Sequence, residues 1–134
     1  MIAVIDTNVF VSGCINPSGA PGRILDLVRA GALRLAVNDL ILSEYRNVLR
    51  RPSLSPYFKI SDIEHIIGYL QSGGTQVLTV IQITGLPNPH DAPFLEVALA
   101  GGSPLVTGNV KHFPQNLRHG VVVENPTAFL RRFE

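Results

Sequence analysis

Four oxygen-bearing side chains stand at positions from which this sequence could build a reactive site. Asp6 directly follows the apolar run 2–5, and Asn109 lies near the end of a later predicted strand. Glu44 falls in the first half of a predicted helix, and Asp91 begins another. Carboxylates repel one another when they are brought together, and a hard divalent cation such as Mg²⁺ or Mn²⁺ relieves that repulsion through oxygen ligands. If the fold brings these side chains together, they predict a metal site.

Each acidic residue also has an ordinary structural explanation. Asp6 could cap the following turn, Asp91 could be the N-cap of its helix, and Glu44 could be a solvated helix residue. Taken singly, each residue fits the structural role better than a catalytic one. The case for a site therefore depends on the elements that would position these residues.

Those elements alternate between strands and helices along the chain. Apolar and β-branched runs predict strands at 2–5, 33–37, 77–83, 104–107 and 121–123. Helical spacing, capping residues and terminal Gly or Pro predict helices at 23–30, 38–51, 61–73, 91–100 and 127–133. Residues 6–8 are predicted as a polar turn, and a loop rich in Asn, Pro, Ser and Gly leads from there to the first helix.

This alternation predicts an α/β fold in which right-handed crossovers join parallel strands and helices cover both faces of one sheet. In such open sheets, ligands bind beyond the carboxyl ends of the strands, where the direction of winding reverses. Asp6 and Asn109 both follow strands, so we expect them to lie at the same edge of the sheet. Polar residues at strand ends therefore carry the functional information.

Composition limits the class of protein but does not name a partner. The 134 residues fit one domain spanning 1–134, and the single Cys14, which cannot form an internal disulfide, fits a reducing cytoplasm. We expect a cytoplasmic protein without a membrane span, because no secretory signal and no run of about 18 apolar residues occurs. A net charge of +1 gives no strong overall field, so any nucleic-acid binding must depend on local basic patches.

Four short motifs occur in the order and spacing found in PIN-domain proteins. They are IDTNVF at 5–10, LSEY at 42–45, DAPFLE at 91–96 and LVTGN at 105–109. Four motifs in order are far more specific than any one of them. Over nearly its whole length the chain resembles the VapC-like PIN-domain toxins of toxin–antitoxin systems. The resemblance implies a three-layer α/β/α PIN-like fold with a central parallel sheet.

The same resemblance implies a Mg²⁺- or Mn²⁺-dependent endoribonuclease. Asp6, Glu44 and Asp91 match the three principal acids of the family, and Asn109 stands at its fourth position, where Asp is common. We expect Asp6 and Asp91 to be direct metal ligands, and Glu44 to bind through water or to help deprotonate the attacking water. Asn109 would orient a water or a second ion. Its neutral amide leaves open whether one metal or two are bound.

Neighbouring polar and basic residues would complete such a site. The supporting polar residues are Thr7, Asn8 and Thr107, although turn hydrogen bonding explains them as well. Arg46, Arg50 and Lys111 are candidate RNA contacts, because basic groups that flank an acidic site can bind phosphates. Arg51, His112, Arg118 and His119 belong to the same two basic segments. A solvated surface explains each of them equally well.

The resemblance also implies partners. A toxin of this group would pair with a small antitoxin protein, a segment of which would cover the acidic cleft. It would also form a homodimer. The sequence itself shows neither contact.

Three other functions have to be weighed. An enzyme that uses Asp6 as a nucleophile, such as a phosphatase, usually needs a second acid two residues later, where this chain has Asn8. A receiver domain would need paired acids after the first strand and an acceptor Asp after the third, and neither is visible. A PIN-like module with a weakened metal site, binding RNA or protein without catalysis, is the stronger alternative because Asn109 is neutral.

Overall fold

Five short parallel strands form the sheet at the centre of the computed structural model, which describes residues 1–133. They lie in the order β3-β2-β1-β4-β5. Their bounds are β1 (Ile2–Ile5), β2 (Arg34–Val37), β3 (Thr75–Gln76), β4 (Leu105–Val106) and β5 (Val123–Glu124). The chain winds to one side of β1 through β2 and β3 and to the other through β4 and β5. The carboxyl end of β1 is therefore the point where the winding reverses.

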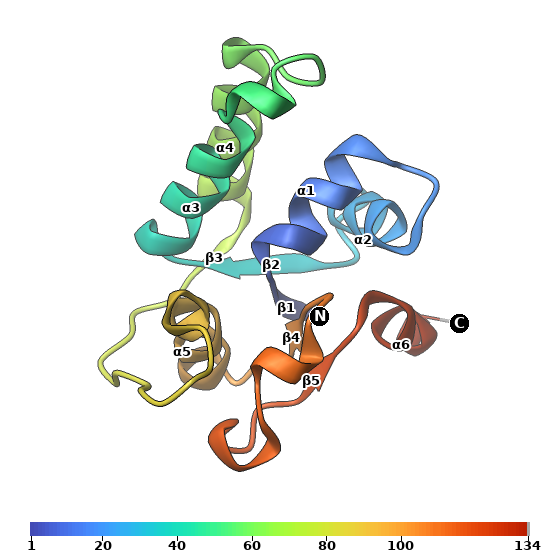
Figure 1. The fold of residues 1–134 in the computed structure, drawn as a ribbon. Helices are drawn as coiled ribbons and strands as arrows, with labels where there is room; N and C mark the ends of the chain where they lie inside the picture. Colours follow the sequence, from blue (N-terminus) through green and yellow to red (C-terminus); the bar gives the residue numbers. More distant parts are fainter. Residues whose placement is uncertain (134) are drawn as a thin grey trace.

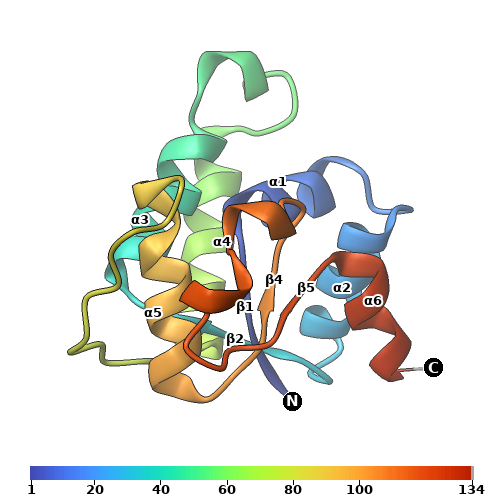
Figure 2. The same ribbon diagram turned by 60° about the horizontal axis from the view of Figure 1, so that its bottom comes forward.

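Six α-helices surround this sheet. They are α1 (Thr7–Ile15), α2 (Ala20–Arg29), α3 (Asp39–Leu49), α4 (Ile60–Gly73), α5 (Ala92–Gly101) and α6 (Pro126–Leu130). Figures 1 and 2 show α1 to α4 on one side of the sheet and α5 on the other, and α6 packs against α2. This arrangement confirms the predicted three-layer α/β/α fold with a central parallel sheet. No helix within residues 1–133 combines the length and the apolar character that crossing a bilayer requires.

Several predicted elements have the ends that their sequences indicate. The Asn38 side chain accepts a hydrogen bond from the Ile41 amide at 2.9 Å and so caps α3. The Asn125 side chain caps α6 in the same way through the amide of Ala128 at 2.8 Å. α5 is capped at its end by Gly102, whose φ of 63° is the left-handed conformation that favours glycine after a helix.

The first helix of the structure is not among the predicted elements. Thr7–Ile15 forms α1 directly after Asp6, where a polar turn and a loop are expected. Its buried residues are Thr7, Val9, Phe10 and Gly13, so two of the four buried positions hold residues that are not strongly apolar. The apolar Val11 and Ile15 are only partly buried, and the sequence therefore lacks the periodicity that marks an amphipathic helix. α2 also begins earlier than predicted, at Ala20 instead of residue 23.

The predicted strand at 77–83 is wrong. Only Thr75–Gln76 pairs with β2, because β2 ends at Val37, where the chain turns into α3. The amide of Val77 still donates to the Val37 carbonyl, and no ladder follows it. Leu78 and Val80 are each 87% exposed, so their β propensity is not matched by burial.

Smaller differences concern the ends of elements. The helix predicted from residue 61 begins at Ile60, and the Asp62 carboxylate accepts from the Lys59 amide at 3.2 Å, so the capping residues lie earlier than predicted. The last strand is Val123–Glu124 instead of 121–123. The helix predicted at 127–133 is α6 followed by a 3₁₀ turn over Arg131–Phe133. The predicted domain also includes Glu134, which lies outside the described residues.

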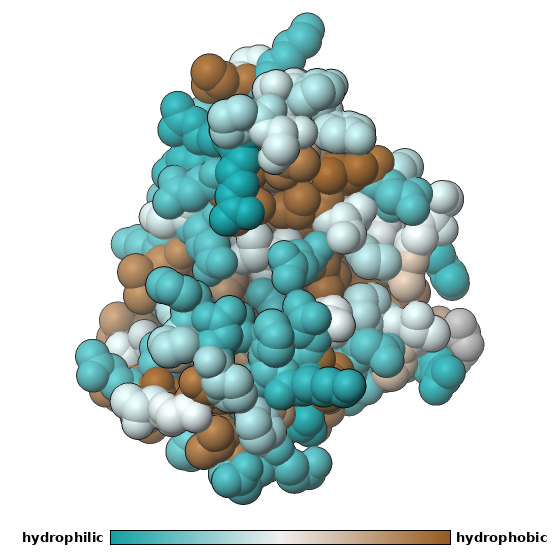
Figure 3. Space-filling view, viewed as in Figure 1, coloured by the Kyte–Doolittle hydropathy of each residue, from teal (hydrophilic) through white to brown (hydrophobic). Residues whose placement is uncertain are grey.

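Apolar side chains also form part of the surface. A groove between α1, α2 and α4 is lined mainly by carbon atoms and appears as a brown area in Figure 3. Its lining residues include Phe10, Cys14, Leu25, Ile66 and Tyr69.

Tyr45 joins the helical layer to the central strand. Its side chain is fully buried and its hydroxyl donates a hydrogen bond to the carbonyl of Ile5. The ring stacks on Phe10 of α1, with centroids 4.3 Å apart. The contact holds α3 beside the end of β1, and therefore holds Glu44 near Asp6.

We expect Tyr45→Phe to reduce the free energy of unfolding by roughly 1–3 kcal/mol, because the buried Ile5 carbonyl would lose a donor while the aromatic stacking remained. Urea denaturation measures the change. Tyr69→Phe on α4 is the control, since that residue is 49% exposed and its change should stay within about 0.5 kcal/mol. Equal effects of the two substitutions would contradict this role for the Tyr45 hydroxyl.

Candidate functional site

Asp6 occupies the end of the central strand, where the winding of the sheet reverses. Its backbone amide donates to the carbonyl of Val106 at 2.9 Å, so the neighbouring strand β4 fixes its position. Its side chain is almost completely buried, and the carboxylate Oδ2 accepts a hydrogen bond from the Thr107 hydroxyl at 2.7 Å. A buried carboxylate with only one side-chain donor keeps unused acceptor capacity.

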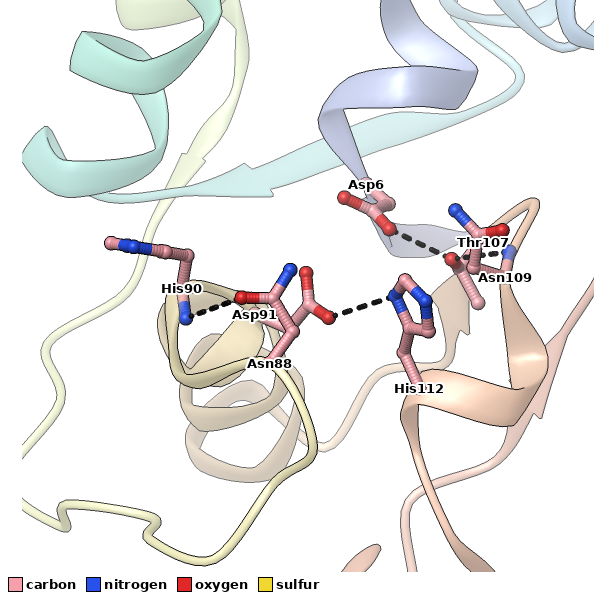
Figure 4. Close-up of polar contacts among 7 residues, drawn as sticks. All are labelled: Asp6, Asn88, His90, Asp91, Thr107, Asn109 and His112. Carbon is pink, nitrogen blue, oxygen red and sulfur yellow. Dashed lines mark hydrogen bonds and ion pairs between the residues drawn. The ribbon is translucent and has the colours of Figure 1, made fainter.

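Thr107 connects Asp6 with Asn109, as Figure 4 shows. The Thr107 hydroxyl donates to Asp6 and accepts from the Asn109 backbone amide at 3.0 Å. Thr107 is completely buried, which makes this short chain of hydrogen bonds rigid. The structure thus brings Asp6 and Asn109 to one edge of the sheet, as expected from their places after two strands.

Asp91 reaches the same region from the other side of the sheet. It ends the 3₁₀ turn η2 (Pro89–Asp91), and α5 begins directly after it. The Asn88 side chain accepts from the His90 amide at 3.2 Å and fixes this turn. Figure 4 shows the Asp91 carboxylate directed toward His112 and the space below Asp6. Its Oδ2 lies 3.3 Å from the His112 Nδ1, but it is buried and makes no well-formed hydrogen bond.

The contact between His112 and Asp91 is a feature that the sequence analysis missed. His112 belongs to the turn η3 (Val110–His112), which follows Asn109. The sequence places it only among the basic residues of a loop, and a separation of 21 positions between the two residues carries no local signal. Asp6 could be predicted as a site residue because it directly follows a strand. The contact between His112 and Asp91 depends instead on how the chain crosses the sheet.

Glu44 lies on α3, half-buried and next to Tyr45. Burial is the main cause that raises its pKa, and the negative charges of Asp6 and Asp91 raise the pKa further. The Thr7 hydroxyl and His90 oppose part of this rise. Glu44 therefore shares the electrostatic field of the two aspartates.

The pKa values of both aspartates are also raised. Desolvation is the largest cause for Asp6, and the Thr107 hydrogen bond and His112 partly counteract it. For Asp91, desolvation comes first and the charge of Asp6 second, while His112 again lowers the pKa. Three neighbouring carboxylates whose pKa values are raised by burial, two of them also by the charge of another acid, are typical of functional sites.

The donor atoms suit a hard divalent cation, although they do not form a closed ligand set. Within the described 133 residues, no three His, Cys, Asp or Glu side chains lie close enough together to hold a metal ion as they stand. Two oxygens in this region, Asp91 Oδ2 and Thr7 Oγ1, are nevertheless buried without a hydrogen-bond partner. Carboxylate and hydroxyl oxygens are ligands that Mg²⁺ and Mn²⁺ accept, and a cation would relieve the mutual repulsion of the acids.

The remaining predicted residues take different positions. Thr7 is buried in the first turn of α1, whereas Asn8 is exposed there. The Arg46 guanidinium forms an ion pair with Glu64 of α4 at 3.0 Å, so it is already engaged within the protein. Arg50 is exposed at the end of α3, and Lys111 is exposed within η3, between Asn109 and His112.

Comparison with known proteins gives consistent results. The family described as PIN domain matches residues 3–111. The chain is 29% identical to an uncharacterized protein of Methanocaldococcus jannaschii over an alignment of 143 positions, gaps included. The alignment covers 98% of this chain and 90% of that protein.

Similar folds occur in solved structures of low sequence identity. VapBC2 from Rickettsia felis, bound to a DNA fragment from its promoter, has a TM-score of 0.63 and 18% identity, covering 93% of this chain and 98% of that one. VapBC-1 from nontypeable Haemophilus influenzae has a TM-score of 0.61 and 16% identity, and the match covers 95% of this chain and 99% of that one. A protein from Pyrobaculum aerophilum has a TM-score of 0.59 and 12% identity, and the match covers 97% of this chain and 87% of that one.

The raised pKa of Asp6 predicts that this residue opposes folding at neutral pH. The folded protein holds the proton more tightly than the unfolded chain, so the ionised carboxylate costs stability above the raised pKa. The cost disappears as the pH falls below the ordinary value of 3.8. We expect Asp6→Asn, which can still accept from Thr107, to raise the free energy of unfolding by about 0.5–2 kcal/mol at neutral pH.

Urea denaturation of both proteins across an acid-to-neutral pH series measures this effect. The advantage of the variant should shrink steadily toward acid. Asp26→Asn on the surface of α2 is the control and should change stability by less than about 0.5 kcal/mol. A variant that is less stable than wild type at neutral pH, or an advantage that does not vary with pH, would show that the charge of Asp6 carries no folding cost.

Proposed function

This chain belongs to the PIN domain family and is VapC-like, and from that premise we propose that it is a Mg²⁺- or Mn²⁺-dependent endoribonuclease, the toxin of a toxin–antitoxin pair. PIN domains are generally nucleases. The observation that carries the proposal is the pair of buried carboxylates, Asp6 and Asp91. They reach one space at the reversal point of the sheet, and Asp91 keeps an oxygen there without a hydrogen-bond partner. We treat residues 1–134 as one PIN domain.

In this proposal Asp6 and Asp91 hold the cation directly, and Glu44 lies beside them. A bound divalent cation would supply Lewis acidity and offset negative charge on the phosphoryl oxygens of RNA. Thr107 orients the Asp6 carboxylate through its hydrogen bond, so this ligand needs little rearrangement when it binds.

Glu44 is the proposed proton acceptor. Its raised pKa makes the carboxylate a better base than an exposed glutamate, while its half-buried position leaves it accessible to water. The proton of the attacking water would pass to a Glu44 carboxylate oxygen. The side-chain amide of Asn109 would orient a water or a phosphoryl oxygen, because it offers both donors and an acceptor.

Lys111 and Arg50 are the proposed contacts to RNA phosphates, since both are exposed. Arg46 is a weaker candidate for such a contact because Glu64 already pairs with it. A phosphate contact of this kind positions the substrate and carries no base specificity.

We also propose a cognate antitoxin as partner, a homodimer, and a cytoplasmic location. The similarity to VapBC2 and VapBC-1 structures supports the antitoxin. The apolar groove between α1, α2 and α4 supports association with another protein, because exposed apolar surface of this kind marks interaction sites. The single Cys14 supports a reducing compartment.

A PIN-like module that binds RNA or protein without catalysis is the second candidate. It is favoured by the neutral Asn109 and by the open spacing of the acids described above. A phosphatase with Asp6 as nucleophile is disfavoured, since the residue two positions later is Asn8, an exposed amide on α1.

We expect purified protein to cleave RNA with Mg²⁺ or Mn²⁺ and to lose activity with a chelator. Asp6→Asn and Asp91→Asn should each lower the cleavage rate by at least about 100-fold, because each removes a proposed ligand. Asp26→Asn is the matched control and should retain full activity. Cleavage that survives both the chelator and Asp6→Asn would contradict the proposed chemistry, and RNA binding without any cleavage would favour the non-catalytic module.

Asn109→Asp tests whether the fourth position faces the metal. The added carboxylate should strengthen Mn²⁺ binding roughly tenfold, which corresponds to about 1.4 kcal/mol of attraction. Calorimetric titration with Mn²⁺ measures the affinity, and Asn116→Asp in the exposed turn η4 (Gln115–Leu117) makes the same chemical change away from the site. An unchanged or weaker affinity in Asn109→Asp would place this side chain away from the cation.

A further inference from the structure

We propose that His112 is a positioning residue that holds the Asp91 carboxylate toward Asp6 and so prepares the site to bind its divalent cation. The inference rests on the proposed function, because it assigns Asp91 as a ligand. It assigns to His112 a role that is distinct from metal ligation and from proton transfer.

The two aspartates are held in unequal ways. The carboxylate of Asp6 receives the hydroxyl hydrogen bond of Thr107, a completely buried side chain. The backbone of Asp91 is fixed, since its amide donates to the Asn88 carbonyl at 3.1 Å, but its carboxylate has no comparable donor. Within the described residues, the ion-pair contact of Asp91 is with the ring nitrogen Nδ1 of His112, which lies 3.3 Å from Oδ2. The orientation of Asp91 therefore depends on this contact.

His112 is well placed to orient another group because its own backbone is fixed. Its amide donates to the Asn109 carbonyl at 2.9 Å, which ties it to the residue that Thr107 holds. The next residue, Phe113, is completely buried, and its carbonyl accepts from the Arg118 Nε at 2.7 Å. The ring thus projects from a fixed support to the side of the Asp91 carboxylate, below Asp6 and Thr107 in Figure 4.

The charge of the neighbourhood favours the same role. The Asp6 carboxylate repels that of Asp91, and the His112 imidazole, whose Nδ1 lies 3.3 Å from Asp91 Oδ2, opposes that repulsion when it carries a proton. Nδ1 is the ring nitrogen that faces Asp91, so the imidazole lies beside the carboxylate that we propose it orients.

The test is Mn²⁺ titration of four proteins: wild type, His112→Ala, His112→Asn and His65→Ala. We expect His112→Ala to weaken Mn²⁺ binding by roughly 10- to 100-fold, because Asp91 loses its partner. In His112→Asn the amide nitrogen takes a position close to that of Nδ1, so binding should recover to within about threefold of wild type. His65→Ala removes an exposed histidine of α4 and should bind as wild type does.

A second measurement needs neither metal nor RNA. In the metal-free protein, His112→Ala should lower the urea midpoint of unfolding when Asp91 is present and should leave it unchanged in an Asp91→Ala background. Identical effects of His112→Ala in the two backgrounds would show that the residues are not coupled, and would overturn the inference.

The titration has two further outcomes that would overturn the inference. Wild-type affinity in His112→Ala would show that Asp91 needs no positioning partner. Failure of His112→Asn to restore binding would mean that the imidazole itself acts as a ligand. If wild type neither binds Mn²⁺ nor cleaves RNA, the proposed function fails and this role for His112 fails with it. If wild type does both and His112→Ala equals it, only the present inference fails.

Discussion

The hydrogen bond from the Tyr45 hydroxyl to the Ile5 carbonyl is the contact on which the site depends most. Tyr45 belongs to α3 and Ile5 ends β1, while the Tyr45 ring stacks on Phe10 of α1 and lies 6.3 Å from Phe94 of α5. One fully buried side chain thus joins four elements. Each of these elements lies at a candidate site residue. α1 begins with Thr7 and α3 contains Glu44, while Asp6 directly follows β1 and Asp91 directly precedes α5. Burial and the charges of Asp6 and Glu44 raise the pKa of this phenol well above 10.0, so it remains a donor.

The acids around the end of β1 oppose the stability of the fold. Asp6, Glu44 and Asp91 all have raised pKa values, which means that their ionised forms are less favourable in the folded protein than in the unfolded chain. The apolar core around β1 must offset this cost, and β1 is accordingly buried along Ala3, Val4 and Ile5. A domain selected for stability alone would have no reason to gather carboxylates at this end of the strand.

The parts of the fold that local rules govern could be predicted from the sequence. The continuous apolar run of β1 predicts a strand, and Asn38 predicts the start of α3, because each of these signals is contained within a few residues of the sequence. The helix α1 could not be predicted, because Thr7 and Gly13 take buried positions while the apolar Val11 and Ile15 are only partly buried, which removes the helical period from the sequence. The segment 77–83 has strand composition, yet it lacks a neighbour because β2 ends at Val37, a fact that only the sheet order reveals.

The candidate site likewise contains residues that the sequence predicts from local patterns and residues that only contacts between separate segments position. Asp6, Thr107 and Asn109 follow strands, so a rule about strand ends is enough to bring them together. Asp91 arrives only after the chain has crossed from β3 back over the sheet. A contact within that crossing supports it: the Glu96 carboxylate of α5 accepts from the Ile83 amide, 13 positions earlier, at 2.8 Å. The place of Asp91 is therefore set by non-local contacts that no short pattern encodes. His112 follows Asn109 in the chain and contacts Asp91, so it lies between the residues that strand ends position and the residue that the crossover positions. This contact can be seen only in the three-dimensional structure.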